Sequence, residues 1–303
     1  MRPSCPSISS LAAGVQERVL LDAVGRCLPE SKATGFERLA RAWDERNLEH
    51  LRESMSVIAR YLLDAARQTE DIGKAPRSLV SLLSPAERDA HGRRSRDAMA
   101  EVVGRLQRSD AQATSSLLVL HGIDQSAAGV LNHQLEESFV VQDAIDARQA
   151  GMAGAASGAA VGVTIDLLTA GLTLGLAAAA GAVVGGGAAW VAAVWKNQAT
   201  PAGTSVVQLS DGMLQAMVEA GLLRYLAVIH FGRGRAGSGG SEIRPEWRSE
   251  VVAAVERRSD DLREQWAHAR SAQVALEPTA ALVGMLEAIA LAVLRQLYAA
   301  TPR

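Results

Sequence analysis

Aromatic residues are scarce in this chain, at 4% of the sequence. Strand-rich folds draw on aromatic and β-branched side chains, whereas close-packed helices are readily built from alanine and leucine. Hydrophobic residues still make up 48% of the 303 positions, enough to bury a sizeable core. We therefore expect an all-α protein, a multi-helix bundle whose core is mostly Ala, Leu and Val.

Cysteine and net charge are also low. The two cysteines, Cys5 and Cys27, are too few for a disulfide framework, and the first residues have no apolar run like that of a secretory signal. The formal net charge of -2 gives no overall field that attracts nucleic acid. We expect a cytosolic start to the chain and no nucleic-acid partner.

Sequence signatures of catalysis and cofactor binding are lacking. A phosphate-binding P-loop needs Gly-x-x-x-x-Gly-Lys-Ser/Thr, but the one Gly-Lys pair, Gly73-Lys74, is followed by Ala75. The six histidines show no His-Glu-x-x-His spacing, and there is no Gly-x-Ser-x-Gly elbow. We therefore expect a protein that is not an enzyme and that holds no cofactor or metal.

One long stretch, Gly151 to Lys196, has a single ionisable side chain before its last residue, Asp166. Glycines at four-residue spacing remove the side chains from one stripe of a helix, so that another backbone can approach closely. A break at Thr169-Ala170-Gly171 separates two limbs, about Ala150 to Leu168 and about Leu172 to Trp195. The stretch predicts a glycine-zipper helical hairpin packed through Gly154, Gly158, Gly162, Asp166, Gly171, Gly175, Gly181 and Gly185.

This hairpin fits two environments. As helices, limbs of this length reach ~29 Å and ~36 Å, which match a hydrocarbon core of roughly 30 Å. Trp190, Trp195 and Lys196 are typical of an anchor at the membrane interface. The alternative is a hairpin buried as the core of a soluble helical body, since Ala and Gly contribute little to insertion. In either environment Asp166 has two readings. It marks a polar contact within an apolar span or, as we favour, it lies at the turn of the hairpin.

Amphipathic helices are predicted before the hairpin. One covers Leu11 to Cys27, and a second runs from Thr34 or Gly35 to about Ala66. A loop is expected from Glu70 to Arg77. The second helix has an expected inner stripe of Phe36, Leu39, Ala40 and Trp43.

Local signals mark the ends of a further helix. Ser84 and Pro85 are a strong start, because Ser caps free amides and Pro suits the first turn. Gly122 is a typical C-terminal stop. The chain is therefore divided into an N-terminal amphipathic helical region (1–145), the glycine-rich hairpin (146–200) and a C-terminal helical region (201–303).

The C-terminal region is predicted to hold three helices: Ser210 to Phe231, Pro245 to about Gln273, and an apolar helix from about Pro278. The residues from Pro201 to Val206 are expected to be a connector. Polar residues gather where the first of these helices meets the glycine-rich loop 232–240, and we interpret them as a candidate polar contact site. A loop end with solvated arginines explains the same residues. They are Arg224, His230, Arg233 and Arg235.

Several blocks of the sequence together resemble one bacterial family. The chain is similar to the C-terminal region of Era-like GTPase proteins, known as domain of unknown function 3482. The blocks are Leu120-His121-Gly122-Ile123-Asp124, the glycine stripe leading into Asp166-Leu167, the run from Gly171 to Gly175, and Leu223 to Arg235 with Trp247 soon after.

The resemblance implies a role but no catalytic residues. Members of that family usually carry a GTP-binding domain ahead of this region, and this sequence departs from the pattern because it has no P-loop. The resemblance implies an effector or membrane-facing part that works with a separate protein partner, such as a separately encoded GTPase. We expect it on the cytoplasmic side of the inner membrane, or in the cytoplasm. A soluble scaffold that forms homo-oligomers through its apolar C-terminal helix is the alternative.

Overall fold

The computed structural model describes residues 14–74, 85–123, 195–199, 204–231, 245–271 and 280–299. Within these ranges the protein is helical apart from one small sheet, so the predicted all-α class is confirmed. The predicted glycine-zipper hairpin lies outside the described residues up to residue 194. The elements are α1 (Gly14–Cys27), α2 (Glu30–Arg67), β1 (Thr69–Lys74), α4 (Pro85–Leu120), β2 (Trp195–Ala199), β3 (Thr204–Leu209), α8 (Asp211–Phe231), α9 (Pro245–Glu256), α10 (Ser259–Ser271) and α11 (Ala280–Ala299).

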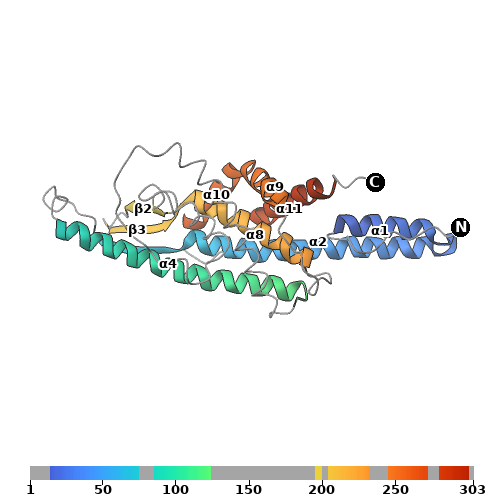
Figure 1. Cartoon of the computed structure of the whole chain (residues 1–303), viewed down its shortest axis with the longest axis horizontal. Coiled ribbons are helices and arrows are strands. Elements are labelled where there is room, and N and C mark those ends of the chain that lie inside the picture. The colour runs from blue at the N-terminus through green and yellow to red at the C-terminus, as the bar shows by residue number, and fades with distance from the viewer. Residues whose placement is uncertain are drawn as a thin grey trace.

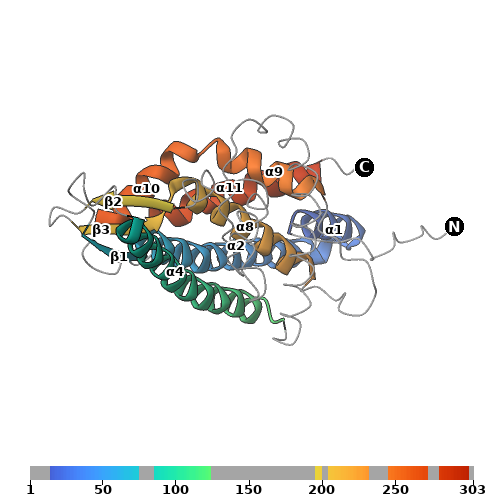
Figure 2. The same ribbon diagram turned by 60° about the vertical axis from the view of Figure 1, so that its left-hand side comes forward.

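Helix α2 is the central helix of the protein and contacts α1, α4, α8, α10 and α11. The long helix α4 runs along one side of α2, and α9, α10 and α11 lie on the other side, with α8 between these layers (Figure 1). The sheet closes one end of this body, and α1 lies at the opposite end (Figures 1 and 2). The regions predicted as N-terminal and C-terminal therefore pack side by side.

The two halves of α2 are buried to different extents. From Leu51 onward the helix buries a stripe at helical spacing that includes Met55, Ile58 and Leu62. In the first half, Ala40 is buried, but Leu39 and Trp43 are 54% and 46% exposed, so the expected inner stripe is wrong for these two residues. Most of the buried residues of α2 therefore lie from Leu51 onward, and α1 lies along the first half of the helix (Figure 1).

The small sheet corrects three predictions. Its order is β1-β3-β2, and both pairings are antiparallel. The predicted loop from Glu70 to Arg77 contains all of β1 except Thr69. The predicted helical limb that ends at about Trp195 overlaps the first residue of β2. The predicted connector from Pro201 to Val206 contains the first half of β3. Val207 and Leu209 of β3 are buried with Ile72 of β1, so the sheet extends the helical core.

The helix ends follow local chemistry in most places. Helix α4 begins at Pro85 and ends just before Gly122, which has a φ of 65°, as predicted. The single helix expected from Pro245 to about Gln273 is instead two helices, α9 and α10, which meet at a turn at Arg257 and Arg258. The apolar stripe continues across this turn, which explains why periodicity alone missed it.

Two described helices are long and apolar enough to cross a membrane by length and composition, Asp211–His230 in α8 and Ala280–Leu297 in α11. The α8 segment is 78% buried within the protein and is a core helix. The α11 segment is 33% buried and places Ala281, Gly284, Ala288 and Ala292 on an exposed face.

Candidate functional site

Helix α8 carries the described part of the predicted contact site, and its polar side chains face different neighbours. Arg224 Nη1 donates to Asp110 Oδ1 of α4 at 2.9 Å, and Nη2 donates to Asp110 Oδ2 at 3.0 Å. The two side chains are only 4% and 8% exposed. Such a fork-to-fork pair satisfies most of the two charges away from water. Arg224 therefore ties α8 to α4.

His230 faces another helix. Its ring lies edge-on to the Trp247 ring of α9, with 5.2 Å between the ring centroids. Six residues along a helix turn the direction of a side chain by roughly 240°, which is why Arg224 and His230 point to different neighbours. Arg233 and Arg235 lie outside the described residues. The contact site formed by all four residues stays a prediction.

A second polar cluster joins the end of α4 to α2. The Ser54 hydroxyl donates to the His50 carbonyl oxygen at 2.7 Å and lies 2.9 Å from His121 Nε2. The single proton of the hydroxyl is donated to the His50 carbonyl. Ser54 Oγ therefore accepts a hydrogen bond from the N–H of His121 Nε2, in the neutral tautomer of the ring. Burial, together with the neighbouring His50, lowers the pKa of His121 from 6.5 to about 4. The His121 ring is therefore neutral near pH 7.

The same cluster reaches α8 through Tyr225. The His121 ring centroid lies 6.1 Å from that of His50 and 6.0 Å from that of Tyr225. A serine beside a histidine also occurs in nucleophilic sites. Here Ser54 is fully buried and its proton is engaged by a helix carbonyl, so the contact joins helices. No sequence pattern singles out Asp110 or Ser54, whereas Tyr225 lies in the Leu223 to Arg235 block that resembles the family.

Two further arginines fasten helices to the sheet. Arg105 of α4 donates to Gln68 Oε1 at 2.7 Å, to the Thr69 carbonyl at 3.2 Å and to Glu70 Oε2 at 2.8 Å. Arg270 of α10 donates to Asp211 at the start of α8 and, at 2.9 Å, to the Leu209 carbonyl. Multiple donors in a rigid plane suit arginine to such junctions.

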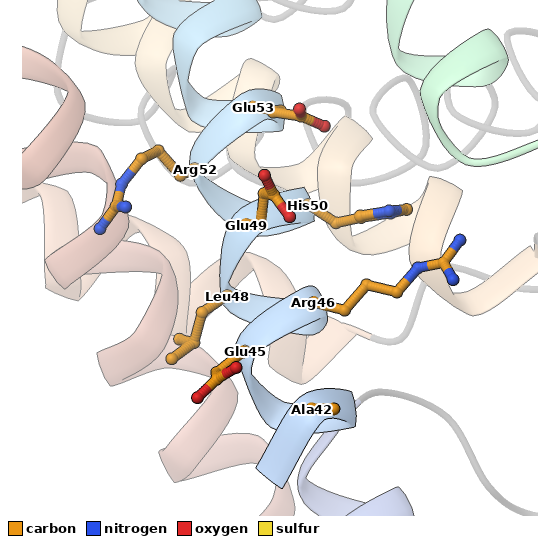
Figure 3. Close-up of a pocket in the computed structure, with 8 residues that line it drawn as sticks. All are labelled: Ala42, Glu45, Arg46, Leu48, Glu49, His50, Arg52 and Glu53. Atoms are coloured by element: carbon orange, nitrogen blue, oxygen red, sulfur yellow. The ribbon is translucent and has the colours of Figure 1, made fainter. Parts of the chain in front are cut away.

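A hollow of about 750 Å³ adjoins the first half of α2. Figure 3 shows Arg46 and His50 projecting to one side of the helix and Leu48 and Arg52 to the other. Arg52 is engaged by Glu287 of α11 at 2.9 Å. The described lining residues come from this one helix and do not converge on a point, as a small-molecule site requires. Within the described ranges, no three His, Cys, Asp or Glu side chains are grouped to hold a metal ion.

The sequence as a whole places the chain in a family. It matches the family described as Domain of unknown function (DUF3482) over residues 9–283. The chain belongs to this family. No curated protein and no solved structure matches it. The match confirms the predicted DUF3482 family, and it assigns no partner and no reaction to any residue.

Proposed function

We propose that this DUF3482 chain is a non-enzymatic, membrane-associated helical module. Its glycine-rich stretch 151–194 enters the cytoplasmic membrane from the cytoplasmic side, and its helical body binds a separate protein. Two features of the sequence of that stretch support this proposal. Asp166 is its one ionisable side chain, and each of its two limbs is long enough to cross the hydrocarbon core of a membrane as a helix.

The observation that carries the proposal is the composition of the core. Helices α2, α4, α8, α9, α10 and α11 and the sheet bury their apolar side chains against one another in a single cluster. A body built around a central hairpin would leave its apolar faces to be covered by that hairpin. The large hydrophobic side chains exposed in the described residues are instead scattered over three helices: Val24, Leu39, Trp43, Leu48 and Val119.

The partner we propose is a separately encoded GTPase. The resemblance to the C-terminal region of Era-like GTPase proteins suggests this class of partner. The Gly73-Lys74 pair lies within β1, whereas a P-loop lies between a strand and a helix. Nucleotide binding is therefore assigned to the partner, and the purified chain is expected to give no heat of binding with GTP in calorimetry.

Fractionation of cells that produce the full chain tests insertion. We expect the chain in the membrane fraction after high-salt and alkaline washes, and in solution after detergent is added. Full recovery in the salt-washed soluble fraction without detergent would contradict the proposal.

A charge in the stretch separates the two environments. Val183→Arg adds a charge that costs roughly 2.5–3.5 kcal/mol at the centre of a membrane span. We expect less of this variant in membranes, with the circular dichroism and melting temperature of the helical body unchanged. Ala253→Arg, on the exposed side of α9, is the matched control and is expected to keep its membrane fraction. Unfolding of the body by Val183→Arg would favour a buried hairpin.

The second candidate is a soluble scaffold that self-associates, and one observation favours it. The exposed face of α11 is built from alanine and glycine between Ala280 and Ala292, and a Cβ added at Gly284 would meet nothing within 4 Å. Small residues let a second helix approach closely. Sedimentation would show a dimer that Ala288→Arg dissociates and Ala253→Arg does not. A monomer at all concentrations would contradict this candidate.

A further inference from the structure

Helix α4 ends in a tightly bonded cap. The Gly122 amide donates to the Val119 carbonyl at 3.0 Å, and the Ile123 amide donates to the Leu118 carbonyl at 2.9 Å. With Gly122 in the left-handed region, this is a Schellman motif, and Ile123 packs against the core, a contact that often accompanies the motif. The cap fixes the direction in which the chain leaves α4.

His121 is the residue of this cap that reaches the rest of the protein. From α2 it faces the His50 ring and the Ser54 hydroxyl, and from α8 the Tyr225 ring. The exposed groups Arg46, Glu49 and Glu53 flank His50 on α2. Among the described residues, no carboxylate forms a hydrogen bond or ion pair with the His121 ring that would balance a positive charge there.

We propose that the contact of His121 with Ser54 and His50 is an acid-sensitive latch, which holds the end of α4 against α2 and α8 and opens when His121 takes up a proton. Nε2 already carries the proton donated to Ser54, so the added proton binds Nδ1 and makes an imidazolium ion. That ion is partly shielded from water and lies beside a second imidazole. Opening returns it to water, which stabilises its charge.

The sign of the effect follows from linkage between protonation and opening. The closed latch binds a proton on His121 with a pKa of about 4, and the opened residue regains the ordinary value of 6.5. The closed state is therefore fully favoured above pH 6.5 and loses this advantage as the pH falls toward 4. With these two pKa values, linkage gives a rise in the open fraction of about 25-fold between pH 7.5 and pH 5. This is an upper limit, because His121 retains some contact with solvent, which screens its charge.

Hydrogen exchange of the full chain, in buffer or in detergent, measures the latch directly. The amides of Gly122 and Ile123 are expected to lose up to about 25-fold in protection from pH 7.5 to pH 5, after correction for the intrinsic exchange rate. The amides of the buried α11 residues Leu286 and Val293 are the internal control and keep their protection. Unchanged protection at Gly122 and Ile123 would overturn the proposal.

Two variants connect the effect to His121. His121→Gln keeps an N–H donor toward Ser54 and cannot become charged, so its cap is expected to be equally protected at both pH values. Ser54→Ala removes the acceptor and lowers protection at pH 7.5. A loss of protection in His121→Gln as large as in the wild type would refute the latch.

A measurement on the wild type covers the case in which His121→Gln does not fold. The His121 ring signals are followed by NMR as a function of pH, and a midpoint well below 6.5 supports the latch, whereas a midpoint at 6.5 overturns it. The latch does not rest on membrane insertion, because each readout is the same for a soluble chain.

Discussion

Arg224 and Asp110, which are 114 residues apart in the sequence, form two parallel hydrogen bonds at 2.9 and 3.0 Å inside the protein. Each side chain is more than nine-tenths shielded from water. The pair joins the core helix α8 to the outer helix α4. Burying two charges costs desolvation energy that good geometry offsets only while both partners are present.

Removal of one partner is expected to be far more costly than removal of both. Asp110→Ala should lower the free energy of unfolding by about 3–5 kcal/mol, because it leaves the Arg224 charge buried alone. The double variant Asp110→Leu with Arg224→Met should recover most of that loss. Urea denaturation of the single and double variants measures the difference.

An exposed pair provides the control. Arg258 and Asp261 also lie 2.9 Å apart, but each side chain is 48% exposed. Asp261→Ala is therefore expected to change the free energy of unfolding by less than about 1 kcal/mol. Equal losses at Asp110 and Asp261 would show that burial of the Arg224 pair is not what makes it costly to break.

Two glycines in apolar helices should respond oppositely to alanine. A Cβ at Gly221 of α8 would lie 3.0 Å from Ile58 Cγ2, whereas one at Gly284 of α11 would meet open space. Alanine favours a helix by about 1 kcal/mol over glycine, but overpacking costs roughly 1–3 kcal/mol. We expect Gly221→Ala to destabilise the protein and Gly284→Ala to stabilise it, as measured by thermal unfolding.

A double variant tests the cause at Gly221. In an Ile58→Ala background the crowding atom is absent, so Gly221→Ala should become stabilising. A destabilising effect in both backgrounds would mean that Ile58 is not the source of the crowding.

The glycine at the α4 cap should be hard to replace. Gly122 has a φ of 65°, and a residue with a Cβ loses roughly 1–2 kcal/mol in that conformation. Gly122→Ala is expected to lower the free energy of unfolding by about this amount. Gly104→Ala, within the same helix, meets the flexible end of Arg108 at 3.7 Å and should be neutral or stabilising. A similar effect of both substitutions on the urea midpoint would argue against the cap.

Glu219 of α8 should make stability depend on pH. Burial, with a smaller effect of Glu256, raises the pKa of Glu219 above its ordinary value of 4.5, against the opposing effects of Gln215 and Arg248. The folded protein therefore holds this proton more tightly than the unfolded chain does, and the stability that results is lost as the pH rises.

The variant Glu219→Gln removes that dependence. The free energy of unfolding of the variant minus that of the wild type should be larger at pH 7.5 than at pH 4. Urea denaturation of both proteins at each pH measures this difference. Glu256→Gln, which removes the nearby negative charge, should reduce the dependence only in part. A Glu219→Gln variant with the same difference from the wild type at both pH values would contradict the pKa shift.

The helices could be predicted from the sequence because their signals are local. Apolar spacing marks α1, the second half of α2 and α8, and Pro85 and Gly122 mark the ends of α4. The strands could not be predicted in this way. The β1 sequence TEDIGK is polar and has no clear alternation, and its partner strand β3 lies more than a hundred residues further on. Pairing between distant segments, rather than local propensity, determines these strands.

The polar sites show the same limit. Arg224 belongs to the polar residues at the end of an apolar helix that the sequence indicates as a contact site, but its partner Asp110 lies in a polar part of the α4 sequence. His121 belongs to a block that resembles the family, yet nothing near it indicates Ser54 or Tyr225. Each contact joins side chains that only the packing of α2, α4 and α8 brings together.

The position of α8 has a consequence for synthesis on the ribosome. Part of the apolar surface of α2, and a smaller part of that of α4, is covered by α8, which emerges about 100 residues after α4 ends, a delay of roughly 5–20 s at ordinary elongation rates. During that interval the apolar surface that α8 covers in the folded protein lacks this helix. A chaperone that binds this surface early and is released once residue 231 has emerged would protect it. Ribosome-bound nascent chains stalled before and after that residue should therefore differ in how tightly they bind such a chaperone.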